Sequence, residues 1–299
     1  MKRRHFLKTF SAGVIGARFA SPSDLFAAAK EGSTVLSIVT GEDAAAAASK
    51  AVDALGGMSG FVAKGDVVIV KPNIGWDRIP EQAATTNPQV VAELVRLALD
   101  AGAKKVKVFD NTCNTARRCY KKSGIPDAAT AAGADVFFVD ERKYKDVDIG
   151  GEALTTWPVY KDALEADKII NVPIAKHHTL SRVTLAMKNL MGLIGGARNR
   201  IHQKLDTSVV DLAAYFKPSL TVLDASRVLM ANGPQGGNLA DVKQMNTIAA
   251  STDQVAIDAF GATLFDLTAD DLRFVREAYE RGLGEKDLTK VKLIEQSLS

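Results

Sequence analysis

The stretch Val67-Val68-Ile69-Val70-Lys71-Pro72-Asn73-Ile74-Gly75 decides the fold class. Its first four residues form a continuous apolar run, which is typical of a strand covered on both faces. Similar runs lie at 34–39, 106–109, 136–139, 168–172 and 220–223, and helical patterns alternate with them. This alternation predicts an α/β fold in which a mostly parallel sheet carries helices on both faces.

Helical periodicity sets the expected helices between these strands. The clearest helix opens at Asn87-Pro88, with Asn87 as N-cap, and ends at Gly102. Apolar spacing predicts further helices at 44–55, 126–132, 181–191, 253–264 and 269–281. No repeat or linker divides the chain, so we expect a single α/β domain over residues 30–299, with an edge insertion near 143–160.

The first 29 residues have the pattern of a twin-arginine signal peptide. Arg3-Arg4, one spacer residue and Phe6-Leu7-Lys8 precede a short apolar stretch, and Ala27-Ala28-Ala29 forms an A-x-A cleavage site. The apolar stretch is shorter than the roughly 20 residues of a membrane span. We therefore expect cleavage after Ala29, export by the twin-arginine machinery to the periplasm or beyond, and no transmembrane anchor afterwards.

Removal of this segment changes the charge balance of the chain. The whole sequence has a formal net charge of +3, but residues 1–29 hold five basic residues and one acidic residue, so the remainder has a charge of −1. The apparent basicity therefore belongs to the signal. We expect no nucleic acid among the partners.

Polar residues follow four of the predicted strands directly. They are Lys71 and Asn73, Asp110, Lys176 with His177 and His178, and Asp224. Open α/β sheets bind ligands beyond the carboxyl ends of their strands. We therefore expect a shared polar crevice, although ordinary turn and capping chemistry also places such residues at strand ends.

The segment 176–202 is the densest in chemistry. Its predicted helix at 181–191 presents Arg182, Lys188 and Asn189 on one polar side, and Gly192, Gly195-Gly196 and Arg198 follow. Glycines beside basic residues allow close approach to an anion, which favours a carboxylate or phosphate site over a merely solvated helix face.

Three histidines remain after the signal: His177, His178 and His202. A divalent metal held by His177, His178 and Asp224 is one hypothesis, although the spacing matches no tight motif. General acid or base work by a histidine is the other.

The chain has two cysteines, Cys113 and Cys119, too few to hold an iron–sulfur cluster by themselves. We expect a structural disulfide between them; a redox pair is the alternative.

Several of these motifs together resemble the family catalogued as domain of unknown function 362. The resemblance extends over roughly 64–260 and rests on Lys71-Pro72-Asn73, Thr85-Thr86-Asn87-Pro88, Asp100-Ala101-Gly102-Ala103, Asp110, Lys176-His177-His178, Val183-Thr184, Lys188-Asn189, Gly192, Gly233-Pro234 and Gly236. Some members append a ferredoxin-type cysteine run, which this sequence lacks. The resemblance implies that Lys71, Asn73, Lys176, His178, Lys188 and Asn189 form one recurring constellation.

We therefore expect an exported enzyme that acts on an anionic small molecule. The expected substrate-binding residues are Lys71, Asn73, Lys176, Arg182, Lys188, Asn189 and Arg198, and the expected catalytic residues are His178, His202 and Asp110. Twin-arginine export of folded protein motivates a divalent metal as cofactor. A periplasmic anion- or solute-binding protein, or a subunit of an exported redox complex, are the alternatives.

Overall fold

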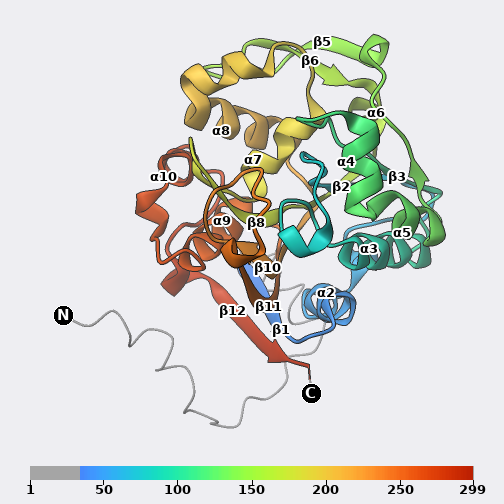
Figure 1. Cartoon of the computed structure of the whole chain (residues 1–299), viewed down its shortest axis with the longest axis vertical. Helices are drawn as coiled ribbons and strands as arrows, with labels where there is room; N and C mark the ends of the chain where they lie inside the picture. The colour runs from blue at the N-terminus through green and yellow to red at the C-terminus, as the bar shows by residue number, and fades with distance from the viewer. Residues whose placement is uncertain (1–33, 299) are drawn as a thin grey trace.

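The computed structural model describes residues 34–298, so the predicted signal peptide at 1–29 lies outside the described residues. The main sheet has ten strands in the order β12-β1-β11-β10-β7-β2-β3-β4, with β8 and β9 attached through β10 (Figure 1). Its strands are β1 (Val35–Thr40), β2 (Val67–Pro72), β3 (Lys105–Val108), β4 (Asp135–Val136), β7 (Lys168–Val172), β8 (Ile174–His178), β9 (Arg182–Thr184), β10 (Leu220–Leu229), β11 (Val242–Ser251) and β12 (Lys292–Ser297).

The centre of the sheet is parallel. Strands β10, β7, β2, β3 and β4 pair in parallel with their neighbours, whereas β11 runs antiparallel to both β1 and β10. The predicted mixed α/β class with a mostly parallel sheet is confirmed. Because parallel strands share a direction, the chain leaves β2, β3 and β7 at one edge of the sheet.

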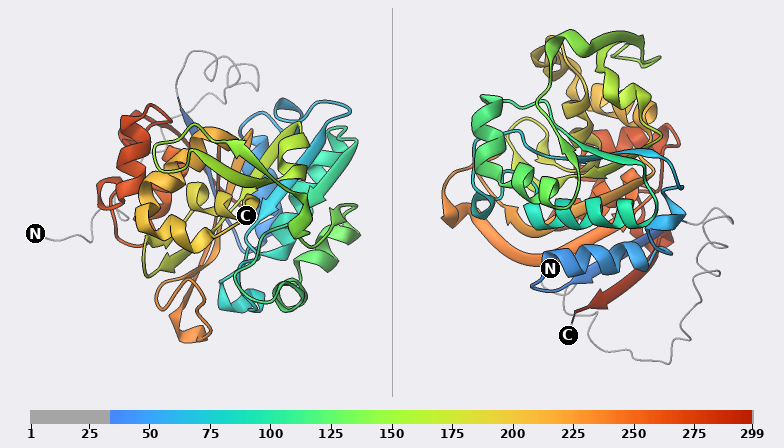
Figure 2. Two further views of the ribbon diagram at one scale, coloured as in Figure 1. Left: turned by 90° about the horizontal axis from the view of Figure 1, so that it is seen from above. Right: turned by 90° about the vertical axis from the view of Figure 1, so that its right-hand side faces the viewer.

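Helices cover both faces of this sheet (Figure 2). One face packs against α2 (Ala44–Asp53), α3 (Pro88–Asp100) and α5 (Ile125–Ala131), and the other against α7 (Ala186–Asn189), α8 (Leu205–Phe216), α9 (Gln254–Thr263) and α10 (Arg273–Glu280). Alternating strand residues feed two separate cores, since Val68 and Val70 face the first and Ile69 the second. This double burial is the physical reason for the continuous apolar runs.

The helix predicted over 181–191 is wrong in its first half. Residues 182–184 form β9 instead, which pairs antiparallel with β8 in the register His177↔Val183. The turn places Arg182 at φ 65°, a left-handed conformation that no helix interior adopts. Helix begins only at Ala186, where the Asp258 carboxylate of α9 accepts hydrogen bonds from the first backbone N–H groups.

The segment near 143–160 forms a small sheet of its own. Strands β5 (Tyr144–Asp148) and β6 (Thr156–Tyr160) pair antiparallel and lie beside α6 (Lys161–Glu165), at the top of Figure 1. The remaining helix, α4 (Ala116–Ser123), follows β3. Among residues 34–298, no helix combines the length and the apolarity that a bilayer crossing demands.

Candidate functional site

The carboxyl ends of β2, β3 and β7 bring three polar side chains together under α7. Lys71 ends β2, Asp110 follows β3, and Asn171 lies within β7 opposite Lys71 in the parallel register. Asn189 of α7 closes the group, because its Nδ2 donates to Asn171 Oδ1 at 2.8 Å and to the Lys71 carbonyl at 3.2 Å. The contacts therefore bring Lys71, Asp110 and Asn189 of the predicted residues together in one buried polar cluster at this edge.

Lys71 is a buried cation surrounded by oxygen atoms. Its Nζ lies 2.9 Å from Asp110 Oδ1 as an ion pair and donates to the Pro72 carbonyl at 2.7 Å and to Asn189 Oδ1 at 3.2 Å. Asp110 Oδ1 makes this ion pair without the geometry of a hydrogen bond. The other carboxylate oxygen of Asp110, Oδ2, accepts a hydrogen bond from Ile74 N at 2.6 Å. Burial lowers the pKa of Lys71, and Asp110 opposes that shift.

Lys176 enters the same cluster from β8. Its Nζ donates to Asn73 Oδ1 at 2.9 Å and to the Ala84 carbonyl at 2.6 Å, while Asn73 Nδ2 donates to Asn189 Oδ1 at 3.0 Å. The side chain is 1% exposed, and burial lowers the pKa of Lys176 to about 7. Two acceptors use two hydrogens, which is the full complement of a neutral amine.

Lys188 is the least satisfied of the three buried lysines. The residue is buried, at 7% exposed. Within the described part of the chain, its Nζ nevertheless donates only to the thioether of Met191, at 3.6 Å. A thioether is a weak acceptor. Burial, with a smaller contribution from the positive charge of Arg198, lowers the pKa of Lys188 to about 8.

Gly192 allows this cluster to close. A Cβ atom at this position would lie 1.7 Å from Asp110 Oδ1 and 2.6 Å from Lys71 Nζ. A side chain here would therefore displace the ion pair. Gly192 was predicted to let the backbone approach an anionic ligand. In the structure, it instead lets the backbone pack against the protein's own Lys71–Asp110 ion pair.

His178 lies two residues after Lys176 on β8, on the same face of the strand, and stays neutral. Its Nδ1 accepts hydrogen bonds from Leu180 N at 3.1 Å and from Ser181 N at 3.4 Å, which assigns the proton to Nε2. Burial, together with Lys188 and Lys176, lowers the pKa of His178 to about 2. The imidazole is thus a neutral hydrogen-bond donor at physiological pH.

The predicted metal ligands do not converge, and the metal-site prediction is not carried forward. His177 and His178 are consecutive on β8 and face opposite sides, and His177 Nδ1 accepts from Gly233 N at 3.1 Å. Asp224 accepts from Asn87 N at 2.7 Å and from the backbone and hydroxyl of Ser226. Over residues 34–298 no three His, Cys, Asp or Glu side chains gather as a metal site.

Three other predicted residues lie outside the cluster. Arg182 is exposed at the first position of β9, where it pairs with Asp271. Arg198 uses its guanidinium on the carbonyls of Asn111, at 2.8 Å, and Thr112, at 2.7 Å. His202 is exposed, with Nδ1 3.2 Å from the Asn199 carbonyl. The structure therefore gives Arg198 a positioning role and leaves Arg182 remote.

Both cysteines are free thiols, so the predicted disulfide is wrong. Cys119 is buried on α4, where its Sγ donates to the Gly75 carbonyl at 3.7 Å. Cys113 is exposed in the loop before α4, and its backbone N donates to the same carbonyl at 2.8 Å. The two residues approach Gly75 from different elements without joining.

The residue list inferred from sequence omitted two members of the site. Asn171 had one sequence signal, a polar residue inside the apolar run of β7. Asp258 had none, because α9 lies far away in sequence; its buried carboxylate accepts from Ala186 N at 2.6 Å and from Met187 N at 3.1 Å, and burial raises its pKa to about 7. Asp258 fixes the start of the helix that carries Lys188 and Asn189.

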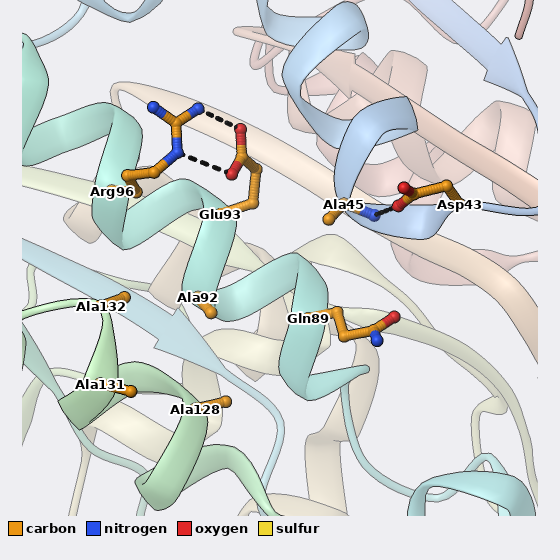
Figure 3. A pocket seen from close by; sticks show the side chains of 9 residues that line it. All are labelled: Asp43, Ala45, Gln89, Ala92, Glu93, Arg96, Ala128, Ala131 and Ala132. Carbon is orange, nitrogen blue, oxygen red and sulfur yellow. Dashed lines mark hydrogen bonds and ion pairs between the residues drawn. The ribbon is translucent and has the colours of Figure 1, made fainter.

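A separate groove lies on the outer helices. Figure 3 shows its lining: the start of α2, one side of α3 and the alanines of α5, with an ion pair between Glu93 and Arg96. Its side chains are mostly small and apolar, and the ion pair is satisfied. It lacks the buried lysines, two of them without a charged partner, that distinguish the strand-end site.

Comparisons with known proteins give limited further guidance. A thylakoid-associated protein of Synechocystis sp. is 27% identical over 215 residues, which are 69% of this chain and 65% of that protein's length. The apoprotein of lactate racemase from Thermoanaerobacterium thermosaccharolyticum aligns with a TM-score of 0.44 and 12% identity, over 76% of this chain and 56% of the other. A Thermotoga maritima protein aligns with a TM-score of 0.37 and 13% identity, over 81% and 60%.

A family profile matches most of the domain. It spans residues 68–263, from the second residue of β2 to the end of α9, and so includes every member of the lysine cluster. Its description is "Domain of unknown function (DUF362)". The predicted resemblance is confirmed, and the chain belongs to this family.

Proposed function

We propose that this protein is an exported enzyme that binds an anionic small molecule between Lys71, Lys176 and Lys188. The observation that carries this proposal is the imbalance of buried charge. Three lysines, each at most 7% exposed, share one buried carboxylate, that of Asp110, and that carboxylate is paired with Lys71. Buried cations without partners are costly, and an anion that reached Lys176 and Lys188 would relieve this cost.

The amines differ in what they can do. Lys71 forms an ion pair with Asp110, so its charge is balanced within the protein. Lys176, with a pKa of about 7, exists in both protonation states at neutral pH, which suits a general acid or base. A receptor that only held anions would gain from permanently charged lysines, so this tuning favours an enzyme over the solute-binding alternative.

The neutral His178 completes the chemistry. Its Nε2–H is available as a donor, since Nδ1 is already occupied by two backbone N–H groups. A neutral donor beside Lys176 and Lys188 can orient an oxygen of the ligand without adding charge. We assign it this orienting role in place of acid or base catalysis.

Anion binding should depend on pH in a defined direction. An anion favours the ammonium forms, so it raises the pKa values of Lys176 and Lys188 from about 7 and about 8. Affinity is then highest below pH 7 and falls as pH rises through 7 to 8. At pH 8, binding should take up protons.

Calorimetry with inorganic phosphate and with small carboxylates tests this proposal. Titrations at pH 8 in two buffers of different ionisation enthalpy count the protons taken up. Lys176→Met and Lys188→Met should each weaken binding about tenfold or more, as expected for a lost charge-assisted hydrogen bond. Lys105→Met, which removes an exposed lysine paired with Asp135, is the control and should leave affinity unchanged.

Two results would count against the proposal in different ways. Binding that is equal in the wild type and in both buried-lysine variants would remove the anion site. Binding that depends on the lysines, without conversion of any bound compound detectable by mass spectrometry, would favour a solute-binding protein.

A further inference from the structure

Cys113 lies beside Gly75, close to the lysine cluster, on a loop held by several hydrogen bonds. Its backbone N donates to the Gly75 carbonyl at 2.8 Å, and Arg198 donates to the carbonyls of the two residues before it, Asn111 and Thr112. Three contacts from two other segments therefore fix an exposed thiol. Such fixation is unnecessary for a surface residue of an ordinary loop.

The thiol and the lysine cluster border the same space beside Gly75. A Cβ atom on Gly75 would lie 3.9 Å from Cys113 Sγ and 3.5 Å from Asn73 Oδ1, the oxygen that accepts from Lys176. Negative charge on Cys113 would raise the pKa values of Lys71, Lys176 and Lys188. The sulfur is therefore within electrostatic range of all three amines.

An independent observation also favours a ligand near Lys188. Lys188 is more than nine-tenths buried, and over residues 34–298 its ammonium has only the weak thioether partner, Met191. The other cysteine provides a contrast, because burial raises the pKa of Cys119 to about 11 and leaves it inert. Only Cys113 combines access to solvent with nearby positive charge.

We propose that Cys113 is the nucleophile of this site and that the substrate is a small carboxylate or phosphate ester carrying an aldehyde or ketone group. This proposal rests on the anion-binding function above. The cations hold the anionic group of the substrate, and its carbonyl carbon lies against the sulfur. The class follows from the pairing of a thiol with unpartnered amines.

The covalent step is an addition that conserves all atoms. The exposed Cys113 thiol releases its proton to solvent, from which Lys176 later regains one, and the sulfur lone pair forms the bond to the carbonyl carbon. The π electrons of the C=O bond move to the oxygen, which takes the proton from the Lys176 ammonium. The product is a thiohemiacetal or thiohemiketal, and no oxidant, reductant or leaving group is required.

Alkylation with reagents of different charge tests the proposal. Iodoacetate is an anion and iodoacetamide is neutral, and mass spectrometry measures the rate of modification at Cys113 with each. We expect the ratio of the two rates to exceed that of N-acetylcysteine amide about tenfold or more, because positive potential concentrates anions. Lys188→Met should reduce this excess severalfold, Lys105→Met should not, and Cys113→Ser should abolish the label. A ratio equal to that of the small thiol would overturn the proposal.

Protection experiments test the addition itself. Glyoxylate, an anionic aldehyde, should slow iodoacetate labelling at concentrations at which acetate has no effect. Equal protection by the two carboxylates would reject the covalent step. Gly75→Ala adds a methyl group at ordinary contact distances from Cys113 and Asn73, so it should fold normally and slow labelling by iodoacetate. Unchanged labelling in this variant would contradict the shared space.

The phosphate titrations keep the two proposals separate. Lysine-dependent phosphate binding together with an ordinary labelling ratio would reject the nucleophile and retain the anion site. Absence of phosphate binding together with an ordinary ratio would reject both.

Discussion

Two buried polar clusters of this protein differ in how completely their charges are satisfied. The Asp211 carboxylate of α8 accepts hydrogen bonds from three backbone N–H groups, those of residues 152–154, and pairs with Arg281 at 2.8 Å. The lysine cluster instead has three amines around one carboxylate, and two of the amines lack a charged partner. A saturated cluster holds the fold together, whereas an unsaturated one is prepared for a ligand.

The largest change in stability should follow from removal of the Asp211 carboxylate. Asp211→Ala leaves the N–H groups of residues 152–154 and the Arg281 guanidinium without their acceptor. We expect the free energy of unfolding to fall by about 3–5 kcal/mol, as for other broken buried pairs. Urea denaturation followed by circular dichroism measures this loss. Asp270→Ala, which removes an exposed partner of Lys286, is the control and should change stability by less than about 1 kcal/mol. A similar loss in both variants would erase the distinction between the clusters.

Removal of a buried charge from the lysine cluster should raise the free energy of unfolding, in contrast to the loss expected for Asp211→Ala. Lys188→Met should raise the free energy of unfolding by about 1–3 kcal/mol at pH 7 without ligand, while it weakens anion binding. The unfolded chain holds the Lys188 proton up to the ordinary pKa of 10.5, but the folded protein releases it near 8. The destabilisation by Lys188 is therefore full below pH 8 and disappears as pH rises toward 10.5.

Urea titrations of the wild type and this variant between pH 7 and pH 10 measure the difference. The advantage of Lys188→Met should shrink across this window. If the variant were less stable than the wild type at every pH, the Lys188 ammonium would be satisfied within the fold, as the Asp211 carboxylate is.

The smallest effect concerns Asp224, which the structure places with the saturated carboxylates. Ser226→Ala removes one of its hydrogen bonds, the 2.6 Å contact from the hydroxyl, and leaves those from Asn87 N and Ser226 N. We expect a loss of about 1 kcal/mol in unfolding free energy and unchanged phosphate affinity. A marked loss of phosphate affinity in calorimetry would show that Asp224 communicates with the lysine cluster.

Predictions from sequence succeeded where burial acts on short segments. The run at 67–70 and its counterparts at 168–172 and 220–223 became central strands, because a strand covered on both faces must be apolar throughout. Residues directly after strands, such as Lys71 and Asp110, met because parallel strands end at one edge. The local rules were sufficient for these residues.

Predictions from sequence failed where the structure of a segment depends on contacts with residues that are distant in the chain. The apolar spacing of 181–191 fits a helix as well as a turn and a strand, and pairing with β8 decided for the strand. Strands β11 and β12 pair with β1 from the far end of the chain, which no local pattern reports. The disulfide between Cys113 and Cys119 was predicted from the cysteine count and the expected export, but the structure leaves Cys119 on α4 and Cys113 in the preceding loop as free thiols.

The sequence by itself determined the α/β class, the central strands and the identity of the residues that gather at their ends. Their chemistry was decided only by the tertiary structure. A lysine side chain has one ordinary pKa in the unfolded chain, and burial in the fold lowers the pKa at Lys71 and lowers it to about 7 at Lys176. Burial removes water from both amines, but Lys71 contacts the Asp110 carboxylate directly, whereas Lys176 contacts only the Asn73 amide oxygen and the Ala84 carbonyl.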